Sequence, residues 1–227
     1  SIGLLQIPPM DLRQVEVIKG VASSLFGASA LGGVVNLLSR EPKATTEHEV
    51  LVNQTTQGAT DLVGWFSGPL SKSWGYTVLA NADHQPRHDA DNDGWADVPE
   101  FSRLSLRPRL FWNDHAGRSV FFTAGLMGED RTGGASGSLK QIGTPWVEAL
   151  KTRRADAGVV ARVLLGSVVL GVRGSANVQS HTHQFGDTTE RDRQATGFGE
   201  VSLTGSHGRN TWVIGGALQR DAYRNQD

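Results

Sequence analysis

An acidic segment at residues 89–100 has the residue types and the spacing of a calcium-binding loop. It reads DADNDGWADVPE and satisfies the pattern D-x-[DN]-x-[DN]-G-x5-E in full. Ca²⁺ prefers about six to eight hard oxygen ligands at flexible distances, and carboxylates that alternate around a glycine turn supply them. The expected ligands are the side chains of Asp89, Asp91, Asp93 and Glu100, the carbonyl oxygen of Trp95, and Asp97 either directly or through water.

The alternative interpretation of this segment is a solvated acidic loop that holds no metal. The pattern lacks the helices that flank an EF-hand loop, and Pro99 is unusual in such a loop. The segment nevertheless carries five carboxylates within twelve residues, and these repel one another unless a cation joins them. The sequence therefore predicts a loop stiffened by calcium and not an EF-hand.

The composition suits an all-β chain with many turns. The chain has 227 residues, of which 28 are glycine, and 38% are hydrophobic. It contains no run of 18 uncharged apolar residues, so we expect no helix that spans a membrane. A formal net charge of -1 gives no polycationic surface for nucleic acid. The absence of cysteine excludes disulfides and thiolate metal sites.

From Glu47 onward the sequence repeats segments of about ten alternating residues separated by turn residues, which is typical of a transmembrane β-barrel. In one of these segments Leu104, Leu106 and Leu110 face one way, while the intervening residues are mostly arginine. The fold class is therefore mostly β. We expect nine antiparallel strands at residues 47–57, 62–70, 75–84, 101–112, 118–128, 157–165, 168–184, 194–204 and 210–221.

The expected connections differ in length according to the end of the strands at which they lie. Those after the even-numbered strands are all short, whereas three of four after the odd-numbered strands are longer, at 85–100, 129–156 and 185–193. Outer-membrane barrels have short periplasmic turns and longer outer loops, so this difference favours a barrel over a soluble sandwich.

The segment at residues 15–40 reads VEVIKGVASSLFGASALGGVVNLLSR, which predicts strand, glycine-rich turns and strand. Its glycine spacing approaches that of a phosphate-binding loop, but Gly33 and Val34 stand where such a loop needs Lys and Ser or Thr. The segment resembles the last part of the plug domain of TonB-dependent outer-membrane receptors, over roughly residues 7–42. The residues that carry this resemblance are Glu16, Lys19, Gly20, Leu25, Phe26, Gly27, Gly32, Gly33 and Asn36; Val21 departs from it, since the family commonly has proline there.

The resemblance implies a plug end at residues 1–43 followed by the first part of a barrel wall at residues 44–227. A lumen that houses a plug belongs to barrels of about 22 strands, so nine strands would make an incomplete barrel. The first residue is Ser1 and no signal segment precedes it, and we expect the sequence to start within a longer protein. By the same resemblance Glu16, Lys19 and Arg40 are candidates for contacts between plug and barrel.

In a barrel, arginine facing the midplane of the lipid costs roughly 2–4 kcal/mol, so we expect Arg103, Arg107 and Arg109 to point into the lumen. There they can attract an anionic ligand or pair with plug carboxylates such as Glu16. His181 and His183 share one face of a strand at its outer end. They can contact a metal-bearing ligand or serve only as polar lumen residues.

The resemblance implies a receptor in the bacterial outer membrane for TonB-dependent uptake of a scarce nutrient, such as a ferric siderophore or cobalamin. Its partners would be lipid, that ligand and the TonB energy-coupling complex, whose contact segment lies upstream of Ser1. The alternatives are a passive outer-membrane channel and a soluble all-β calcium-binding module. We expect no enzyme, because no nucleophile, base and orienting acid form a recognisable set.

Overall fold

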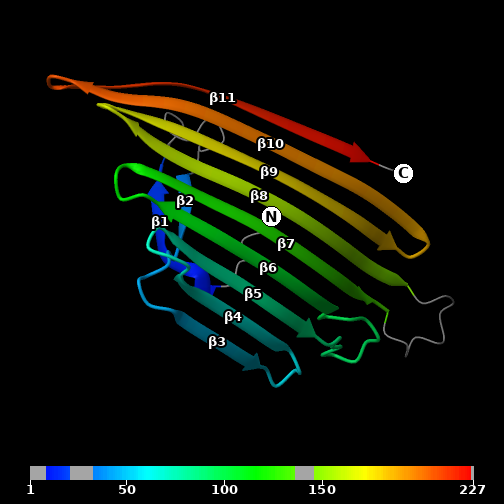
Figure 1. Ribbon diagram of the computed structural model, residues 1–227. Coiled ribbons are helices and arrows are strands. Elements are labelled where there is room, and N and C mark those ends of the chain that lie inside the picture. The colour runs from blue at the N-terminus through cyan, green and yellow to red at the C-terminus, as the bar shows by residue number, and fades with distance from the viewer. Residues whose placement is uncertain (1–8, 21–32, 136–145, 226–227) are drawn as a thin grey trace.

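The computed structural model describes residues 9–20, 33–135 and 146–225. A short 3₁₀ helix, η2 (Pro9–Asp11), precedes a hairpin of β1 (Leu12–Lys19) and β2 (Gly33–Ser39). A nine-stranded antiparallel sheet follows, in which each strand pairs with the next one in the chain (Figure 1). Its strands are β3 (Glu47–Gln54), β4 (Thr60–Pro69), β5 (Trp74–Gln85), β6 (Glu100–Asn113), β7 (Arg118–Gly134), β8 (Val147–Leu165), β9 (Val168–Phe185), β10 (Thr188–His207) and β11 (Asn210–Asn225).

The mostly β fold is confirmed, and all nine expected strands are present in the expected order. The sheet is not closed, because β3 and β11 form its two edges and do not pair with each other. The β1–β2 hairpin lies against one end of this curved sheet (Figure 1). In the described part of the chain no helix has the length and apolar character needed to cross a membrane.

Two of the expected long connections are shorter than predicted. The expected loop at 185–193 is a tight turn around Gly186, whose φ of 59° favours glycine, and β10 already begins at Thr188. The expected loop at 129–156 shrinks because residues 129–134 pair with residues 147–152. Both stretches are rich in charged residues and so look like loops in the sequence, although their backbones continue the ladder. The predicted contrast in loop length therefore holds for the connections at residues 86–99 and 135–146.

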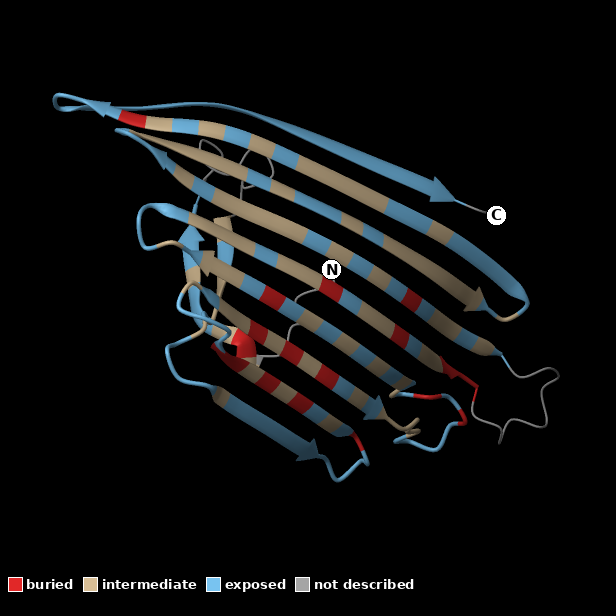
Figure 2. Cartoon of the chain, viewed as in Figure 1, coloured by how far each residue is buried: buried red, intermediate tan, exposed pale blue. Residues whose placement is uncertain are grey.

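The two faces of the sheet differ in chemistry. We call the face on which η2 lies the inward face, because Met10 of η2 packs there against Val63, Trp65 and Leu79. Figure 2 shows the buried positions as red segments that alternate along β4 and β5. The inward face also buries polar side chains, namely Ser67, Thr77, Asn81, Arg109, Glu129 and Thr152.

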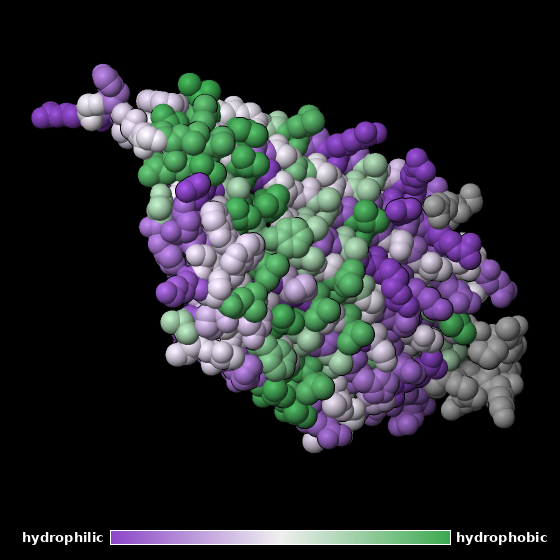
Figure 3. Space-filling view, in the orientation of Figure 1, coloured by the Kyte–Doolittle hydropathy of each residue, from purple (hydrophilic) through white to green (hydrophobic). Residues whose placement is uncertain are grey.

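The opposite, outward face exposes large hydrophobic side chains. Leu104 on β6 is 67% exposed and Leu126 on β7 is 61% exposed. Figure 3 shows a band of hydrophobic atoms that crosses the molecule. A sheet that is polar inside and apolar outside is the reverse of a soluble sandwich, in which the apolar side chains form the interior. The outward face therefore has the character of a surface that meets lipid.

Candidate functional site

Three arginines on β6, Arg103, Arg107 and Arg109, form a row on the inward face, and each meets a carboxylate. Arg103 lies 2.7 Å from Glu129 of β7. Arg107 makes two hydrogen bonds of 2.8 Å to Asp156 of β8. Alternation along β6 places the three guanidinium groups on one side, and the neighbouring strands supply acids at matching positions. One of the two roles expected for this row, pairing with a plug carboxylate, is found at Arg109, whereas Arg103 and Arg107 pair with carboxylates of the wall.

Arg109 makes the contact that joins the N-terminal segment to the wall. Its guanidinium forms two hydrogen bonds to the carboxylate of Asp11, at 2.5 and 2.6 Å. Asp11 is only 2% exposed and Arg109 only 8%, so both charges are removed from water. Removing one partner of such a pair leaves an uncompensated buried charge, which typically costs about 3–5 kcal/mol. The pair therefore holds η2 at one place on β6.

Arg40 reinforces the same junction from the segment between β2 and β3. Its backbone N–H donates to the carbonyl of Asp11 at 2.8 Å, and its Nη2 lies 2.6 Å from Glu49 of β3. The guanidinium also stacks over the ring of Trp65, 3.6 Å from the ring centroid. The pKa of Arg40 is raised above its ordinary value, chiefly by the hydrogen bond to Glu49. Arg40 thus links the hairpin, η2 and the wall.

The other two plug residues singled out in the sequence do not reach the wall. Glu16 accepts hydrogen bonds from Asn36 at 2.9 Å and from Gln14 at 3.2 Å, all within the β1–β2 hairpin. Lys19 is exposed and lies opposite Gly33 in the hairpin register. Across residues 9–20, 33–135 and 146–225, the plug carboxylate that pairs with the arginine row is Asp11 and not Glu16.

The two histidines lie together on the inward face of β9, with ring centroids 5.8 Å apart. His181 Nδ1 is 3.0 Å from the hydroxyl of Thr152, and its Nε2 contacts the side chain of Gln179. His183 Nε2 lies 3.8 Å from Asp192 of β10, and its ring stacks on Phe185. The pair forms a polar and aromatic row near the loop end of β9.

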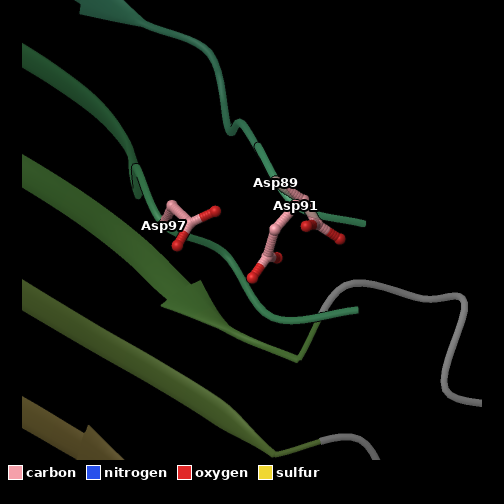
Figure 4. A group of neighbouring side chains, drawn as sticks. All are labelled: Asp89, Asp91 and Asp97. Atoms are coloured by element: carbon pink, nitrogen blue, oxygen red, sulfur yellow. The ribbon is translucent and has the colours of Figure 1, made fainter. Parts of the chain in front are cut away.

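Carboxylates of the acidic loop converge. Side-chain oxygens of Asp89, Asp91 and Asp97 lie within 4.8 Å of one another (Figure 4). Backbone N–H groups fold the loop around them: Gly94 donates to Asp89 at 3.0 Å, and Ala90 donates to Asp97 at 2.8 Å. Their oxygens are the kind of ligand that a hard divalent cation takes.

The remaining three expected ligands lie outside this group. Asp93 accepts a hydrogen bond from the backbone N–H of Trp95 at 2.7 Å. Trp95 pairs by its backbone with Ala135, and Glu100 begins β6 opposite Thr132. The loop thus brings together half of the set that the sequence pattern suggested.

Comparison with known proteins bears on both parts of the chain. The model of the TonB-dependent Receptor Plug Domain matches residues 1–34. Over 157 residues the chain is 27% identical to a ferrioxamine receptor of Yersinia enterocolitica. The aligned region covers 66% of this chain and 20% of that protein. Over 80 residues the chain is 32% identical to the vitamin B12 transporter BtuB of Photobacterium profundum. This aligned region covers 35% of this chain and 13% of that protein.

Solved structures share the fold over nearly all of the chain. The siderophore receptor PiuA of Acinetobacter baumannii superposes with a TM-score of 0.71 at 13% identity, covering 95% of this chain and 36% of that one. The chain therefore resembles the TonB-dependent receptors both in its plug segment and in its fold. It spans about a fifth of the length of the ferrioxamine receptor, and its open sheet is the incomplete barrel of such a receptor.

The protein is therefore located in the bacterial outer membrane. The proteins that it resembles are named as receptors and a transporter, which agrees with the expected absence of enzyme chemistry.

Asp11 and Trp65 are functional residues that the sequence reasoning missed. Asp11 follows two prolines, and nothing in its local pattern marks it as the partner of an arginine 98 residues later. Trp65 lies on the inward face of β4 between Val63 and Ser67, and the alternation of this strand is a signal that could have placed its large side chain there.

Proposed function

We propose that the full-length receptor takes up a ferric siderophore or a similar scarce chelate by TonB-dependent transport. The observation that carries this proposal is the buried Asp11–Arg109 pair, which fastens the end of a plug segment to the inward face of the barrel wall. A plug held inside a barrel closes the pore to passive diffusion, so transport needs an energy source that rearranges it. The siderophore receptors among the similar proteins support the choice of ligand class.

The experiment is uptake by cells. The full-length receptor is expressed in a strain that lacks its own siderophore receptors, and accumulation of labelled ferrioxamine, ferric enterobactin or cobalamin is measured with and without a protonophore. We expect saturable accumulation of one ligand that stops when the protonophore removes the energy source.

The same measurement distinguishes energy-dependent uptake from the rival function, which is passive diffusion through a channel. A passive channel would admit small solutes at a rate proportional to their concentration, and the protonophore would leave that rate unchanged. Unsaturable uptake that is insensitive to the protonophore would overturn the proposal in favour of such a channel.

We also propose that the loop binds Ca²⁺ through Asp89, Asp91 and Asp97. The support is their convergence within 4.8 Å at the end of the sheet, where three like charges otherwise repel one another. Such a cation would stiffen residues 86–99 on the outer side of the barrel. It would not take part in chemistry.

The calcium proposal predicts a difference between two matched variants. In the full-length receptor, millimolar Ca²⁺ should slow proteolysis of residues 86–99, and Asp91→Asn should abolish this protection. Asp93→Asn should keep it, because an amide oxygen can still accept the hydrogen bond from Trp95. Limited proteolysis followed by mass spectrometry measures both effects, and equal cleavage with calcium and with chelator in the unmodified receptor would refute the proposal.

A further inference from the structure

Two histidines and two carboxylates come together on the inward face where β9 and β10 meet their connecting turn (Figure 1). His181 and His183 are two residues apart on β9, so both side chains point to the same face. In the register of the two strands, Asp192 lies opposite His181 and Glu190 lies opposite His183. The four residues, which we call the His–carboxylate cluster, therefore occupy the corners of a rectangle with sides of about 5 and 7 Å.

The side chains of this cluster face one another at distances close to those of a metal site. His183 Nε2 lies 3.8 Å from Asp192 Oδ2, and the centroids of the two imidazole rings are 5.8 Å apart. Two ligand atoms on one tetrahedral zinc ion lie about 3.3 Å apart, because each bond is about 2.0–2.1 Å long. A rotation of the Asp192 side chain closes this difference without any movement of the backbone.

Neighbouring side chains hold both imidazole rings in the orientation that a metal ligand needs. His181 Nδ1 is 3.0 Å from the hydroxyl of Thr152, and its Nε2 contacts the side-chain amide nitrogen of Gln179. We assign the ring proton to Nδ1, because Nε2 then accepts from Gln179 and keeps a lone pair that a metal can take. A hydrogen bond from the second ring nitrogen is what fixes metal-binding histidines in general. The ring of His183 stacks on Phe185 at an interplanar angle of 10°, which restricts its rotation.

The charge and the ligand types of the cluster suit a divalent transition metal ion. Asp192 and Glu190 together supply two negative charges when ionised, and two neutral imidazoles complete the set. Within the described part of the chain, no lysine or arginine forms an ion pair with either carboxylate. Imidazole suits zinc and its neighbours in the first transition row, whereas Ca²⁺ takes oxygen ligands. The cluster therefore differs in selectivity from the acidic loop.

We propose that His181, His183 and Asp192 bind a free divalent transition metal ion such as Zn²⁺, with Glu190 as the fourth ligand. Two ligands come from β9 and two from β10, so the ion ties the two strands together beside their connecting turn. The wall itself holds this ion, which is not part of a transported chelate. The proposal does not depend on which ligand the receptor takes up or on calcium binding by the acidic loop.

The test measures Zn²⁺ binding to the metal-free, full-length receptor in detergent by isothermal titration calorimetry. Millimolar Ca²⁺ is present throughout, so that the carboxylates of the acidic loop do not contribute. His183→Phe keeps a ring beside Phe185 and removes the metal-binding nitrogen. Loss of even an outer-shell partner weakens metal binding about 10–100-fold, so we expect this variant to weaken the tightest zinc site at least about tenfold. The matched control is His48→Phe, which keeps a ring beside Phe66 and should leave zinc binding unchanged.

Two further arms identify the source of the metal and the place where it binds. Excess ferrioxamine should not displace Zn²⁺, and crystals of the unmodified receptor soaked in Zn²⁺ should give an anomalous peak between His183 and Asp192. Equal zinc affinity of His183→Phe and the control would overturn the proposal. Displacement by ferrioxamine would overturn it in favour of a contact between the histidines and a metal-bearing ligand. Circular dichroism verifies the sheet; if His183→Phe misfolds, the anomalous peak alone decides, and its absence at this place would overturn the proposal.

Discussion

At the scale of single residues, the Asp11–Arg109 pair is the contact on which the position of the plug segment depends. Both groups are buried, and both hydrogen bonds are short and charge-assisted. Such a pair need not add net stability, since desolvation opposes the attraction. Its value is specificity: η2 fits β6 where the two charges meet, and any other placement leaves them unpaired.

We expect Arg109→Leu to destabilise the full-length receptor by about 3–5 kcal/mol, because it leaves the Asp11 carboxylate buried without a partner. The double variant with Asp11→Leu should recover much of that loss. The exposed pair of Arg173 and Glu200 provides the control, since Arg173→Leu should cost less than about 1 kcal/mol. Chemical unfolding of the three variants measures these differences, and additive losses in the double variant would contradict a direct pair.

A second prediction at this scale concerns Asp114 in the turn between β6 and β7. Its pKa lies below the ordinary value because the backbone N–H groups of Ala116 and Arg118 donate to it, with the Arg118 side chain adding to the effect. The resulting stabilisation of the turn is present above the pKa of the unfolded chain. It is lost as the pH falls through the lower pKa of the folded state.

Carboxyl chemical shifts measured by NMR should place the midpoint of the Asp114 titration below that of an aspartate in a short peptide. Breaking the guanidinium contact with Arg118→Gln should raise this midpoint only partly, since the backbone donors remain. A midpoint equal to that of the peptide would show that the turn does not favour the charged carboxylate.

At the scale of elements, the turn between β9 and β10 sets the pairing of two of the longest strands. Gly186 has a φ of 59°, and a Cβ atom there would lie 2.6 Å from the ring of Trp146. Gly166, between β8 and β9, has a similar φ of 63° but no atom within 4 Å of its Cβ position. Comparing alanine substitutions at the two glycines therefore distinguishes the cost of backbone strain from the cost of a steric clash with Trp146.

We expect Gly166→Ala to cost about 1–2 kcal/mol through backbone strain alone. Gly186→Ala should cost more, and adding Trp146→Ala should bring that cost back to the level of Gly166→Ala. Thermal unfolding midpoints of the full-length receptor measure the three changes. If Gly166→Ala and Gly186→Ala were equally costly, contact with Trp146 would not be what restricts this turn.

At the scale of the whole molecule, the sheet separates a polar interior from an apolar exterior. This inversion distinguishes a membrane barrel from the soluble β module that composition alone leaves open. It also explains why exposed residues such as Leu104 and Leu126 do not mark an unstable protein. In the outer membrane these side chains meet acyl chains and not water.

Leu126→Arg tests this separation. In the full-length receptor reconstituted in lipid, it should cost about 2–4 kcal/mol, because Leu126 lies outward at the middle of β7. Leu126→Ala, which keeps an apolar side chain, serves as the control and should cost less. Unfolding from lipid vesicles measures both, and a neutral effect of arginine would favour a water-facing surface.

The sequence by itself determined the class of the fold, the number and order of the nine strands, and the resemblance to a receptor family. Alternation with a period of two decides which residues share a face, and this property is local to each strand. The sequence also identified the arginines of β6 as one row and the acidic residues of the loop as one cluster, because both features depend only on spacing along the chain.

Only the tertiary structure decided which groups meet. The partner of Arg109 is Asp11 and not Glu16, and most of the loop expected at 185–193 is strand beside a tight turn at Gly186, because pairing with a neighbour compensates for weak local propensity. The pair of Arg107 and Asp156 likewise depends on register: the two residues are 49 positions apart in sequence and become neighbours only when the strands align. Contacts between distant residues depend on chain topology and register, and these are not encoded in any single segment.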